Sequence, residues 1–347
     1  MCLCRDLLQP VTASTLLSGN RTAMDTMPFN IAVVGPARSQ QGTGPYVARA
    51  FHRLGCNVRA VVSSSLSSAS RAATHLEKEY GIRCQAFAGM EEALEAVPID
   101  IVAICSPPTT HYRYLEAATN AGCHAFCEKP LWWPEQEMRT PECAQRLVND
   151  AQRLVERARE SNITLQLNTQ WVFTLPGFYT LYPQQNPDLR TIETFSMWLS
   201  PQSTGKDMII DAAPHALSML YALFGAGRIE DIRCDSPSDE PGRDLQIVFD
   251  YLHATGDCTV SLGLNSTDVL PKPAAYAINQ QRADRHVELP DYLISLRSSD
   301  RQVPIVDPLM CSVKNFLGSI HSGCGVDETA LIDGMEHLLQ IYLAIDP

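Results

Sequence analysis

The chain has 347 residues, a formal net charge of −12 and a hydrophobic content of 45%. Domains usually contain ~100–200 residues, so this length suits two of them with a sizeable core. The acidic charge, with no basic cluster along the chain, argues against nucleic acids and anionic membrane surfaces as partners, because both require lysine and arginine gathered on one face.

The N-terminus and the cysteines indicate a cytoplasmic chain. No stretch approaches the ~20 apolar residues of a membrane span. The start, Met1-Cys2-Leu3-Cys4 followed by Arg5, lacks the layout of a signal peptide. Twelve scattered cysteines favour reduced thiols over a disulfide framework. Cys123 and Cys127 have a loose metal-ligand spacing but no second pair nearby, so no metal site is expected.

Residues 28–150 alternate between buried strands and helices. The segment before them, 1–27, has no clear period, and we expect a disordered extension or an overlong start. Strand–helix repeats with short links predict an α/β domain built on a doubly wound parallel sheet, a Rossmann-type dinucleotide-binding domain. The expected strands are 29–35, 58–62, 82–87, 101–105 and 124–127, and the expected helices lie at 45–55, 69–80, 90–96 and 109–122.

Residues 151–347 follow a different pattern, which predicts a second α/β domain for substrate binding and dimerisation. A long helix reaches Arg159, and a strand is expected over 163–171. Later strands follow one another without helices, so we expect an open, largely antiparallel sheet whose exposed face suggests a homo-oligomer. A final helix over 327–344 carries an apolar stripe that we assign to the core. The later strands are 192–199, 229–234, 245–251 and 258–264.

The turn after the first strand is a dinucleotide-binding candidate. Glycines there allow the backbone to approach a pyrophosphate at a helix N-terminus. The loop is longer than G-x-G-x-x-G, because Gly35 is followed by further glycines only at Gly42 and Gly44, and it includes Arg38. Its position between the first strand and the first helix favours cofactor binding by these four residues.

The end of the second strand indicates which nicotinamide cofactor is used. An acidic residue at this point would bind the ribose hydroxyls of NAD, but the sequence has Ser63, Ser64 and Ser65, with Arg71 further on. Hydroxyls with a nearby arginine suit the 2′-phosphate of NADP, which an aspartate would repel. We therefore expect NADP(H) rather than NAD(H), the alternative being a plain polar turn.

The stretch from Asp100 to Pro130 organises the first domain. Its second strand delivers Glu128-Lys129-Pro130 at the carboxyl end, and ligands of open parallel sheets bind outside the carboxyl ends of the strands. Lys129 is therefore placed for chemistry, although an ordinary surface lysine beside a turn proline is the alternative. We assign four more residues along this edge to the cofactor: Ser106, Pro107, His111 and Glu128.

A second chemical constellation is Asp211-Ala212-Ala213-Pro214-His215. Proline is tolerable only in the first turn of a helix, so the helix is expected to begin near Asp211. Positions i and i+4 share a face, which puts the carboxylate beside the imidazole, the usual acid–base group near neutral pH. A helix-capping aspartate with a packed histidine is the alternative.

Four motifs together resemble one family, that of glucose–fructose oxidoreductase, inositol dehydrogenase and rhizopine catabolism (Gfo/Idh/MocA). The resemblance covers nearly everything after residue 28. It implies a Rossmann domain, a second domain with an open antiparallel sheet, and hydride transfer with NAD(P). The family's catalytic lysine falls on Lys129, its aspartate–histidine pair on Asp211 and His215, and its substrate-side strand on Asn168 to Trp171. The motifs are the strand–Gly-turn–helix opening, AICSPPTTHYRYLEAATNAGCHAFCEKP, DAAPHALSMLYALFG and the tail DPLMCSVKNFLGSIHSG with IDGMEHLLQIYLAI.

Three departures from the family concern the site. The glycine loop is expanded, Ala213 replaces the usual glycine, and the segment with Trp132 and Trp133 is longer. Aromatic rings offer apolar faces to a sugar, so we expect Trp132, Trp133 and Trp171 to border the substrate site with Asn168, core packing being the alternative.

The leading hypothesis is an NADP-linked oxidoreductase acting on a carbinol/carbonyl pair in a sugar, cyclitol or similar small molecule. His215 would take the hydroxyl proton, Lys129 would stabilise the developing alkoxide, and Asp211 would orient that pair. Two alternatives are a non-catalytic dinucleotide-sensing regulator of the same fold and a glycoside hydrolase that retains its nicotinamide. Retention of the three catalytic residues speaks against the regulator.

Overall fold

The computed structural model describes residues 28–36, 42–134, 140–184, 191–235 and 242–345. These residues form two compact units. The first contains residues 28–168 and the later segment Leu309–Leu331, and the second contains Thr169–Pro308 and residues 332–345. The expected division after residue 150 falls inside a helix, and the first unit continues to Asn168 because the strand at 165–167 pairs with the first sheet.

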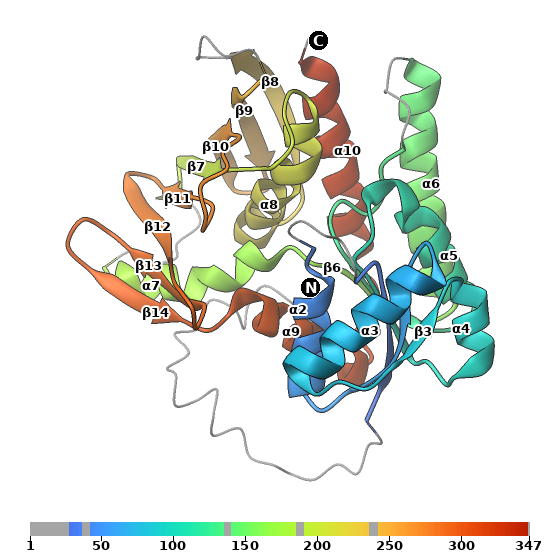
Figure 1. Cartoon of the computed structure of the whole chain (residues 1–347). Coiled ribbons are helices and arrows are strands. Elements are labelled where there is room, and N and C mark those ends of the chain that lie inside the picture. Colours follow the sequence, from blue (N-terminus) through green and yellow to red (C-terminus); the bar gives the residue numbers. More distant parts are fainter. Residues whose placement is uncertain (1–27, 37–41, 135–139, 185–190, 236–241, 346–347) are drawn as a thin grey trace. The chain divides into compact units, whose positions relative to one another are not determined.

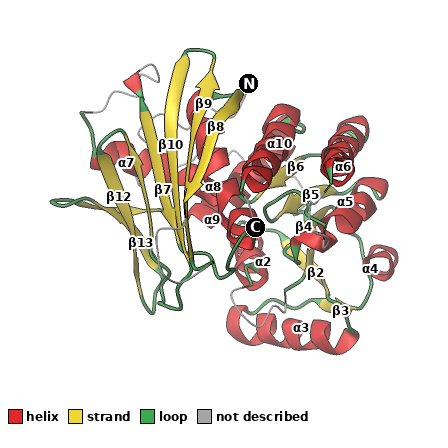
Figure 2. Ribbon diagram, turned by 90° about the horizontal axis from the view of Figure 1, so that it is seen from above, coloured by secondary structure: helices red, strands yellow, loops and turns green. Residues whose placement is uncertain are grey.

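The first unit is built on a six-stranded parallel sheet with the order β3-β2-β1-β4-β5-β6 (Figure 2). The β-branched and apolar runs at its centre explain the arrangement, since all four residues of β4 and the last four of β1 are buried. This is the strand order of dinucleotide-binding Rossmann sheets. The strands are β1 (Asn30–Val34), β2 (Asn57–Val62), β3 (Gln85–Phe87), β4 (Ile101–Ile104), β5 (His124–Cys127) and β6 (Leu165–Leu167).

A helix from late in the chain completes the core of this unit. Phe316 of α9 (Pro308–Ser322) packs against Phe51 of α2 and Phe126 of β5, with ring centroids 6.2 and 5.5 Å apart. All three rings are fully buried, and each burial stabilises by about 1.5–3 kcal/mol. The other helices are α2 (Gly44–Arg53), α3 (Leu66–Tyr80), α4 (Met90–Ala96), the short η1 (Pro108–Thr110), α5 (His111–Asn120) and α6 (Pro141–Glu160).

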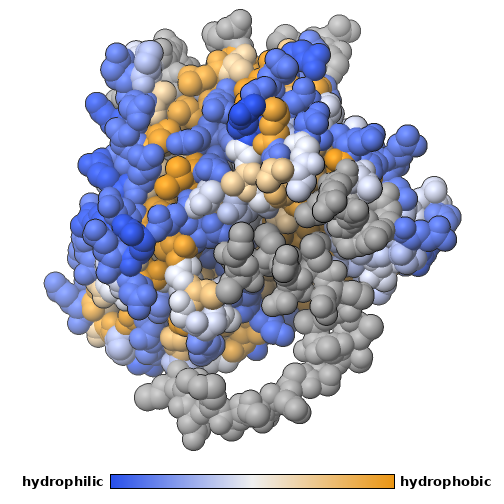
Figure 3. All heavy atoms as spheres, turned by 180° about the vertical axis from the view of Figure 1, so that it is seen from behind, coloured by the Kyte–Doolittle hydropathy of each residue, from blue (hydrophilic) through white to orange (hydrophobic). Residues whose placement is uncertain are grey.

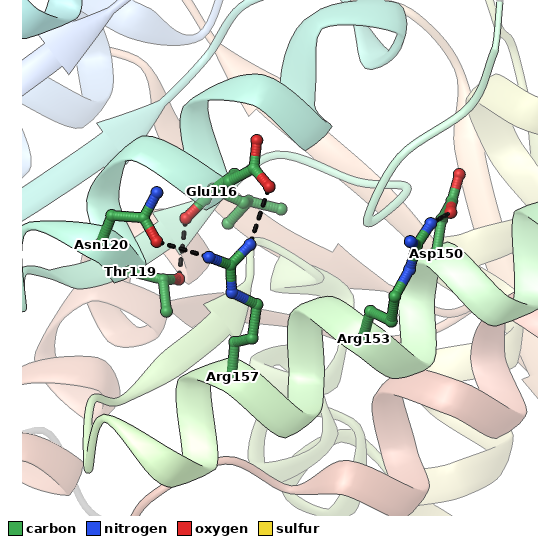
Figure 4. A network of polar contacts seen from close by, with 7 residues as sticks. Glu116, Thr119, Asn120, Asp150, Arg153 and Arg157 are labelled. Carbon is green, nitrogen blue, oxygen red and sulfur yellow. Dashed lines mark hydrogen bonds and ion pairs between the residues drawn. The ribbon is translucent and has the colours of Figure 1, made fainter.

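Polar contacts hold α6 against α5 at the surface of this unit (Figure 4). The Arg157 guanidinium donates to Oε1 of Glu116 and to Oδ1 of Asn120, both at 2.7 Å. A second pair, Asp150 with Arg153, lies within α6 itself. Arg157 and Glu116 are each 41% exposed, so we assign this ion pair at most about 1 kcal/mol and a role in alignment.

The second unit is built on an eight-stranded sheet with the order β14-β13-β12-β11-β7-β10-β9-β8 (Figures 1 and 2). Neighbours are antiparallel except for β7 and β10, which are parallel. Its strands are β7 (Thr194–Leu199), β8 (Gly227–Asp235), β9 (Asp244–His253), β10 (Gly256–Asn265), β11 (Ala274–Ile278), β12 (Gln281–Glu288), β13 (Leu293–Arg297) and β14 (Gln302–Ile305).

Two expectations for the strands of the chain need correction. The four strands expected in this sheet are present, but β11 to β14 are additional strands. Charged residues obscure the alternation of β12, a proline lies in β14, and β11 is apolar throughout, so it has no alternation to mark it. The expected strand 163–171 is only Leu165–Leu167, which belongs to the first sheet, and the chain leaves that sheet after Asn168. It then forms η2 (Gln170–Thr174), which carries Trp171, and α7 (Leu175–Leu181).

The helix that carries Asp211 and His215 begins earlier than expected. It is α8 (Asp207–Phe224), so Pro214 lies in its interior. An interior proline costs ~3 kcal/mol. The extra first turn buries Met208 and Ile209 completely, and each such burial stabilises by about 1.5–3 kcal/mol. Burial therefore outweighs the proline.

The final helix, α10 (Glu328–Ala344), confirms the expected apolar stripe. Its five stripe residues are at most 7% exposed: Leu331, Met335, Leu338, Leu339 and Tyr342.

Hydrophilic side chains dominate the outer surface seen in Figure 3, with apolar residues showing between them. Within the described ranges, no helix combines the length and the hydrophobicity needed to cross a membrane.

Candidate functional site

The sequence-predicted cofactor residues line the carboxyl edge of the first sheet. Parallel pairing of β2, β1, β4 and β5 brings the ends of these four strands to one edge. The order reverses between β1 and β4, and dinucleotides bind at such a switch point. Arg38 lies outside the described residues, so its expected role stays a prediction. The residues along the edge, from β2 to β5, are Ser63, Ser64, Gly35, Ser106, Pro107, Glu128 and Lys129.

The turn between β1 and α2 is shaped by glycine. Gly35 has a φ of +75°, and a Cβ there would stand 2.7 Å from the main-chain N and Cα of Ser106. A Cβ on Gly44 would stand 2.7 Å from Cα of Pro36. Thr43 precedes α2 without capping it by its side chain, so the first amides of the helix have no side-chain acceptor from that residue. Close backbone approach at a helix start that Thr43 does not cap by its side chain fits a pyrophosphate group.

The end of β2 combines a buried hydroxyl with an uncharged helix start. Ser63 is 6% exposed, and its buried Oγ has no hydrogen-bond partner. Ser65 caps α3 by accepting from the amide of Ser68, and no acidic residue lies in the first turn of α3. Ser64 is exposed, as is Arg71, whose Nη1 donates to Oγ of Ser67 at 3.2 Å.

His111, which we expect to bind the cofactor, is held by the main chain of its own unit. Its ring is completely buried, with Nδ1 2.9 Å from the carbonyl oxygen of Pro130 and Nε2 2.8 Å from that of Ser106. Both ring nitrogens therefore face the main chain of the domain itself. His111 ties the end of β4 to the turn that carries Lys129. Burial lowers the pKa of His111, and the carbonyl oxygens of Ser106 and Pro130 oppose this shift.

Replacing His111 by alanine is expected to destabilise the first unit and to loosen the turn at Lys129. The change leaves a buried carbonyl without its donor, which costs about 1–3 kcal/mol. Urea unfolding should show this loss, together with lower kcat. His52→Ala is the matched control, because that histidine is exposed. If both variants unfold at the same urea concentration, the bridging role of His111 is wrong.

Lys129 is the second residue after the end of β5 and is partly exposed. The preceding Glu128 is fixed by its amide, which donates to the carbonyl of Ile104 at 2.8 Å. Its carboxylate accepts from Nδ2 of Asn168 at 2.8 Å. Asn168 is 1% exposed, and its Oδ1 has no hydrogen-bond partner. The end of β6 thus supports the turn before Lys129 and keeps one acceptor for another donor.

Asp211 and His215 lie four residues apart within α8, on one face of that helix. The hydroxyl of Ser203 donates a hydrogen bond to Oδ2 of Asp211, and the distance from Oγ to Oδ2 is 3.4 Å. Both residues are partly exposed, whereas the intervening Ala212, Ala213 and Pro214 are buried. The predicted pair is therefore adjacent on the helix face, and its role in proton transfer stays a prediction.

The three tryptophans have different environments. Trp133 is 4% exposed and its amide donates to the carbonyl of Pro108 at 3.3 Å, which favours core packing. Trp132 packs edge-on against Tyr112, and its buried Nε1 has no hydrogen-bond partner. Trp171 is 5% exposed and lies edge-on to Tyr276 of β11. The expected contact of these indoles with substrate stays a prediction.

No cluster of three or more metal-ligating side chains occurs among the residues that the structure describes. Cys123 and Cys127 are both buried. Burial raises the pKa of the Cys123 thiol to about 11 and raises the pKa of the Cys127 thiol well above its ordinary value. Both sulfurs are therefore protonated near neutral pH, whereas a metal ligand is a thiolate.

Fold and edge together define an NAD(P)-binding protein of the Rossmann type. Residues 29–169 match the family described as the oxidoreductase family with an NAD-binding Rossmann fold. This region of the chain is therefore similar to the Gfo/Idh/MocA oxidoreductase family.

One curated relative is D-glucoside 3-dehydrogenase of Escherichia coli (strain K12), which is 31% identical over 134 residues. The aligned part spans 39% of this chain and 34% of that enzyme. An uncharacterized oxidoreductase of Schizosaccharomyces pombe is 24% identical over 183 residues, or 48% of this chain and 46% of that protein. The chain thus spans a third to a half of the length of these relatives.

Solved structures share the fold over nearly the whole chain. UDP-N-acetylglucosamine 3-dehydrogenase GnnA from Acidithiobacillus ferrooxidans superposes with a TM-score of 0.64 at 18% identity, covering 92% of this chain and 98% of that one. This likeness of fold includes the second unit, beyond residue 169. At this identity it concerns the fold alone.

Proposed function

We propose that this protein is an NAD(P)-dependent oxidoreductase that transfers a hydride between nicotinamide and a carbinol/carbonyl pair of a sugar, cyclitol or similar small molecule. The observation that carries the proposal is the carboxyl edge of the first sheet, where the Gly35 cradle follows β1 and Lys129 lies after the end of β5, with only β4 between these two strands. The similarity to a D-glucoside 3-dehydrogenase supports a sugar as the substrate.

The described residues of the first unit fit a dinucleotide. The turn at Gly35 and the uncapped start of α2 suit the pyrophosphate, and the partnerless Oγ of Ser63 suits an adenosine ribose. The absence of an acidic residue in the first turn of α3 favours NADP(H) over NAD(H). When bound, the nicotinamide supplies the hydride donor or acceptor.

Replacing Ser63 by aspartate is expected to reverse the cofactor preference. A carboxylate at this point repels the 2′-phosphate of NADP and accepts from the ribose hydroxyls of NAD. The ratio of the two dissociation constants should change by about tenfold or more, or ~1.4 kcal/mol. Fluorescence titration with NADPH and NADH measures the ratio. Ser63→Asn is the isosteric neutral control, and wild type that binds NADH at least as tightly as NADPH contradicts the assignment.

Side chains of the protein would accept and donate the proton of the substrate hydroxyl. His215 takes the proton of the substrate hydroxyl during oxidation and returns it during reduction. Lys129 donates a hydrogen bond to the same oxygen and stabilises its developing negative charge. Asp211 orients His215 from the preceding helical turn. These roles rest on the family resemblance and on the adjacency of Asp211 and His215 on α8.

A panel of polyols, glycosides and keto sugars tests the proposal. At least one neutral or anionic sugar should change the absorbance at the reduced-nicotinamide band. The amount of cofactor converted should equal the amount of sugar converted. Cofactor binding without turnover across the panel would favour the sensing regulator instead. Tightly retained cofactor with hydrolysis and no net turnover would favour the glycoside hydrolase. Sedimentation of the same sample tests the homo-oligomer that we also propose.

A further inference from the structure

A cluster with two cationic side chains lies in the second unit. Arg285 is on β12, in phase with the buried Ala283 and Val287, so it points to the buried face of the sheet. Its Cζ is 5.4 Å from the centroid of the Trp171 ring, and its Nη2 donates to the main-chain oxygen of Lys272 at 2.6 Å.

Neither cation has a carboxylate partner within the described ranges. Nζ of Lys272 donates to the carbonyl oxygens of Pro201 and Thr267, at 3.3 and 2.7 Å. Nε of Arg285 is buried and has no hydrogen-bond partner. Burial lowers the pKa of this guanidinium, and Tyr292 is the group that opposes the shift. The guanidinium is thus held by a ring and a carbonyl alone.

Arg282 on the same strand shows the ordinary arrangement. It lies on the opposite face, over the ring of Trp198 at 4.4 Å, and donates to both carboxylate oxygens of Asp284. Each arginine lies over the ring of a tryptophan, but among the residues that the structure describes only Arg282 has a carboxylate counter-ion. The comparison shows that the carboxylate partner is what Arg285 lacks within the described residues.

A partly buried guanidinium without a counter-ion lowers the stability of the fold, because buried charges are normally paired. Its planar fork matches a carboxylate or phosphate in a bidentate way. The packing of η2, which carries Trp171, against α8 links this cluster to the helix of Asp211 and His215. We propose that Arg285, with Lys272 and Trp171, binds a carboxylate or phosphate group of the substrate. Assigning that group to the substrate rests on the proposed function.

Binding of inorganic phosphate and of acetate to the full chain, followed by calorimetry, tests the site directly. NADP⁺ is present throughout, so that the turn before α2 does not contribute. Wild type should bind at least one of the two anions saturably, and Arg285→Met should lower that affinity about tenfold or more, as expected for a lost charge-assisted pair. Arg285→Lys should give an intermediate affinity, and Arg282→Met should match wild type.

Kinetics then identify the source of the anion. Among substrates of the panel, those with a carboxylate or phosphate should have the lowest KM. Arg285→Met should raise the KM of these substrates about tenfold or more while kcat changes little, because the contact is uniform between ground state and transition state. Neutral substrates should be unaffected by the substitution. Preference for carboxylated or for phosphorylated substrates tells which group is bound.

The two proposals can fail separately. Anion binding that depends on Arg285 in a protein without turnover leaves the site standing and removes the proposed function. Equal anion affinity in wild type and Arg285→Met overturns the site and leaves the oxidoreductase intact. A changed oligomeric state of Arg285→Met in size-exclusion chromatography also overturns it, since the guanidinium would then pair across an interface. If Arg285→Met does not fold, unchanged anion affinity in Arg285→Lys has the same meaning.

Discussion

Substituting methionine for Lys129 is expected to lower kcat by about 10²–10³-fold, the usual effect of removing a group that stabilises developing oxyanion charge. Methionine keeps the length of the side chain and removes its charge and its donors. NADPH affinity should change little, because the loss is confined to the transition state. Steady-state kinetics and NADPH fluorescence titration measure the two quantities. Lys78→Met, at a lysine that is 81% exposed on α3, is the matched control.

Adding His215→Ala to Lys129→Met tests whether the two residues act on one oxygen. Groups that act as a unit are non-additive, so the double variant should lose less than the product of the single losses. Strict multiplication of the losses would assign the two residues to separate steps. Activity of Lys129→Met within a few-fold of wild type would remove the catalytic assignment altogether. A regulator would instead keep its ligand response in this variant.

Gly35→Ala is expected to destabilise the first unit severely and to abolish cofactor binding. Left-handed backbone costs a residue with a Cβ about 1–2 kcal/mol. The new Cβ also stands 2.7 Å from the main chain of Ser106, and such overpacking typically costs another 1–3 kcal/mol. Urea unfolding at constant m-value measures the sum, and NADPH fluorescence measures the binding.

Gly55→Ala separates the two costs of the Gly35 substitution. Gly55 has a φ of +90° in the same unit, but a Cβ there meets nothing within 4 Å. It should therefore show only the conformational cost and normal NADPH binding. Equal losses of stability at the two positions would mean that the chain after β4 moves to accommodate the new Cβ. The close approach of the turn to Ser106 would then not restrict residue 35.

Most of the first domain could be predicted from local pattern. Buried β-branched runs, helix-ending glycines and short links indicate alternating strands and helices, and parallel topology then orders the strand ends along one edge. The contribution of α9 could not be predicted this way. Phe316 joins Phe51 and Phe126 across most of the chain length, and an apolar helical stripe does not specify which sheet it covers.

The second unit was less predictable because its decisive residues depend on context. Pro214 indicates a helix start by local rules, yet the burial of Met208 and Ile209 places it inside α8. Strand β12 reads as polar in QRADRHVE, and only its pairing with β11 and β13 shows that Arg285 belongs to the buried phase. A charged residue in phase with Ala283 and Val287 is the signal that could have marked it.

The sequence by itself indicated the resemblance to one oxidoreductase family, the Rossmann sheet and the candidate residues Lys129, Asp211 and His215, because spacing and turn chemistry are local properties. Only the tertiary structure decided the environments of individual side chains. It placed both ring nitrogens of His111 beside carbonyl oxygens of the main chain. It also left Ser63 Oγ and Arg285 Nε buried without partners. Burial and hydrogen bonding depend on residues distant in the chain, and no local pattern specifies those neighbours.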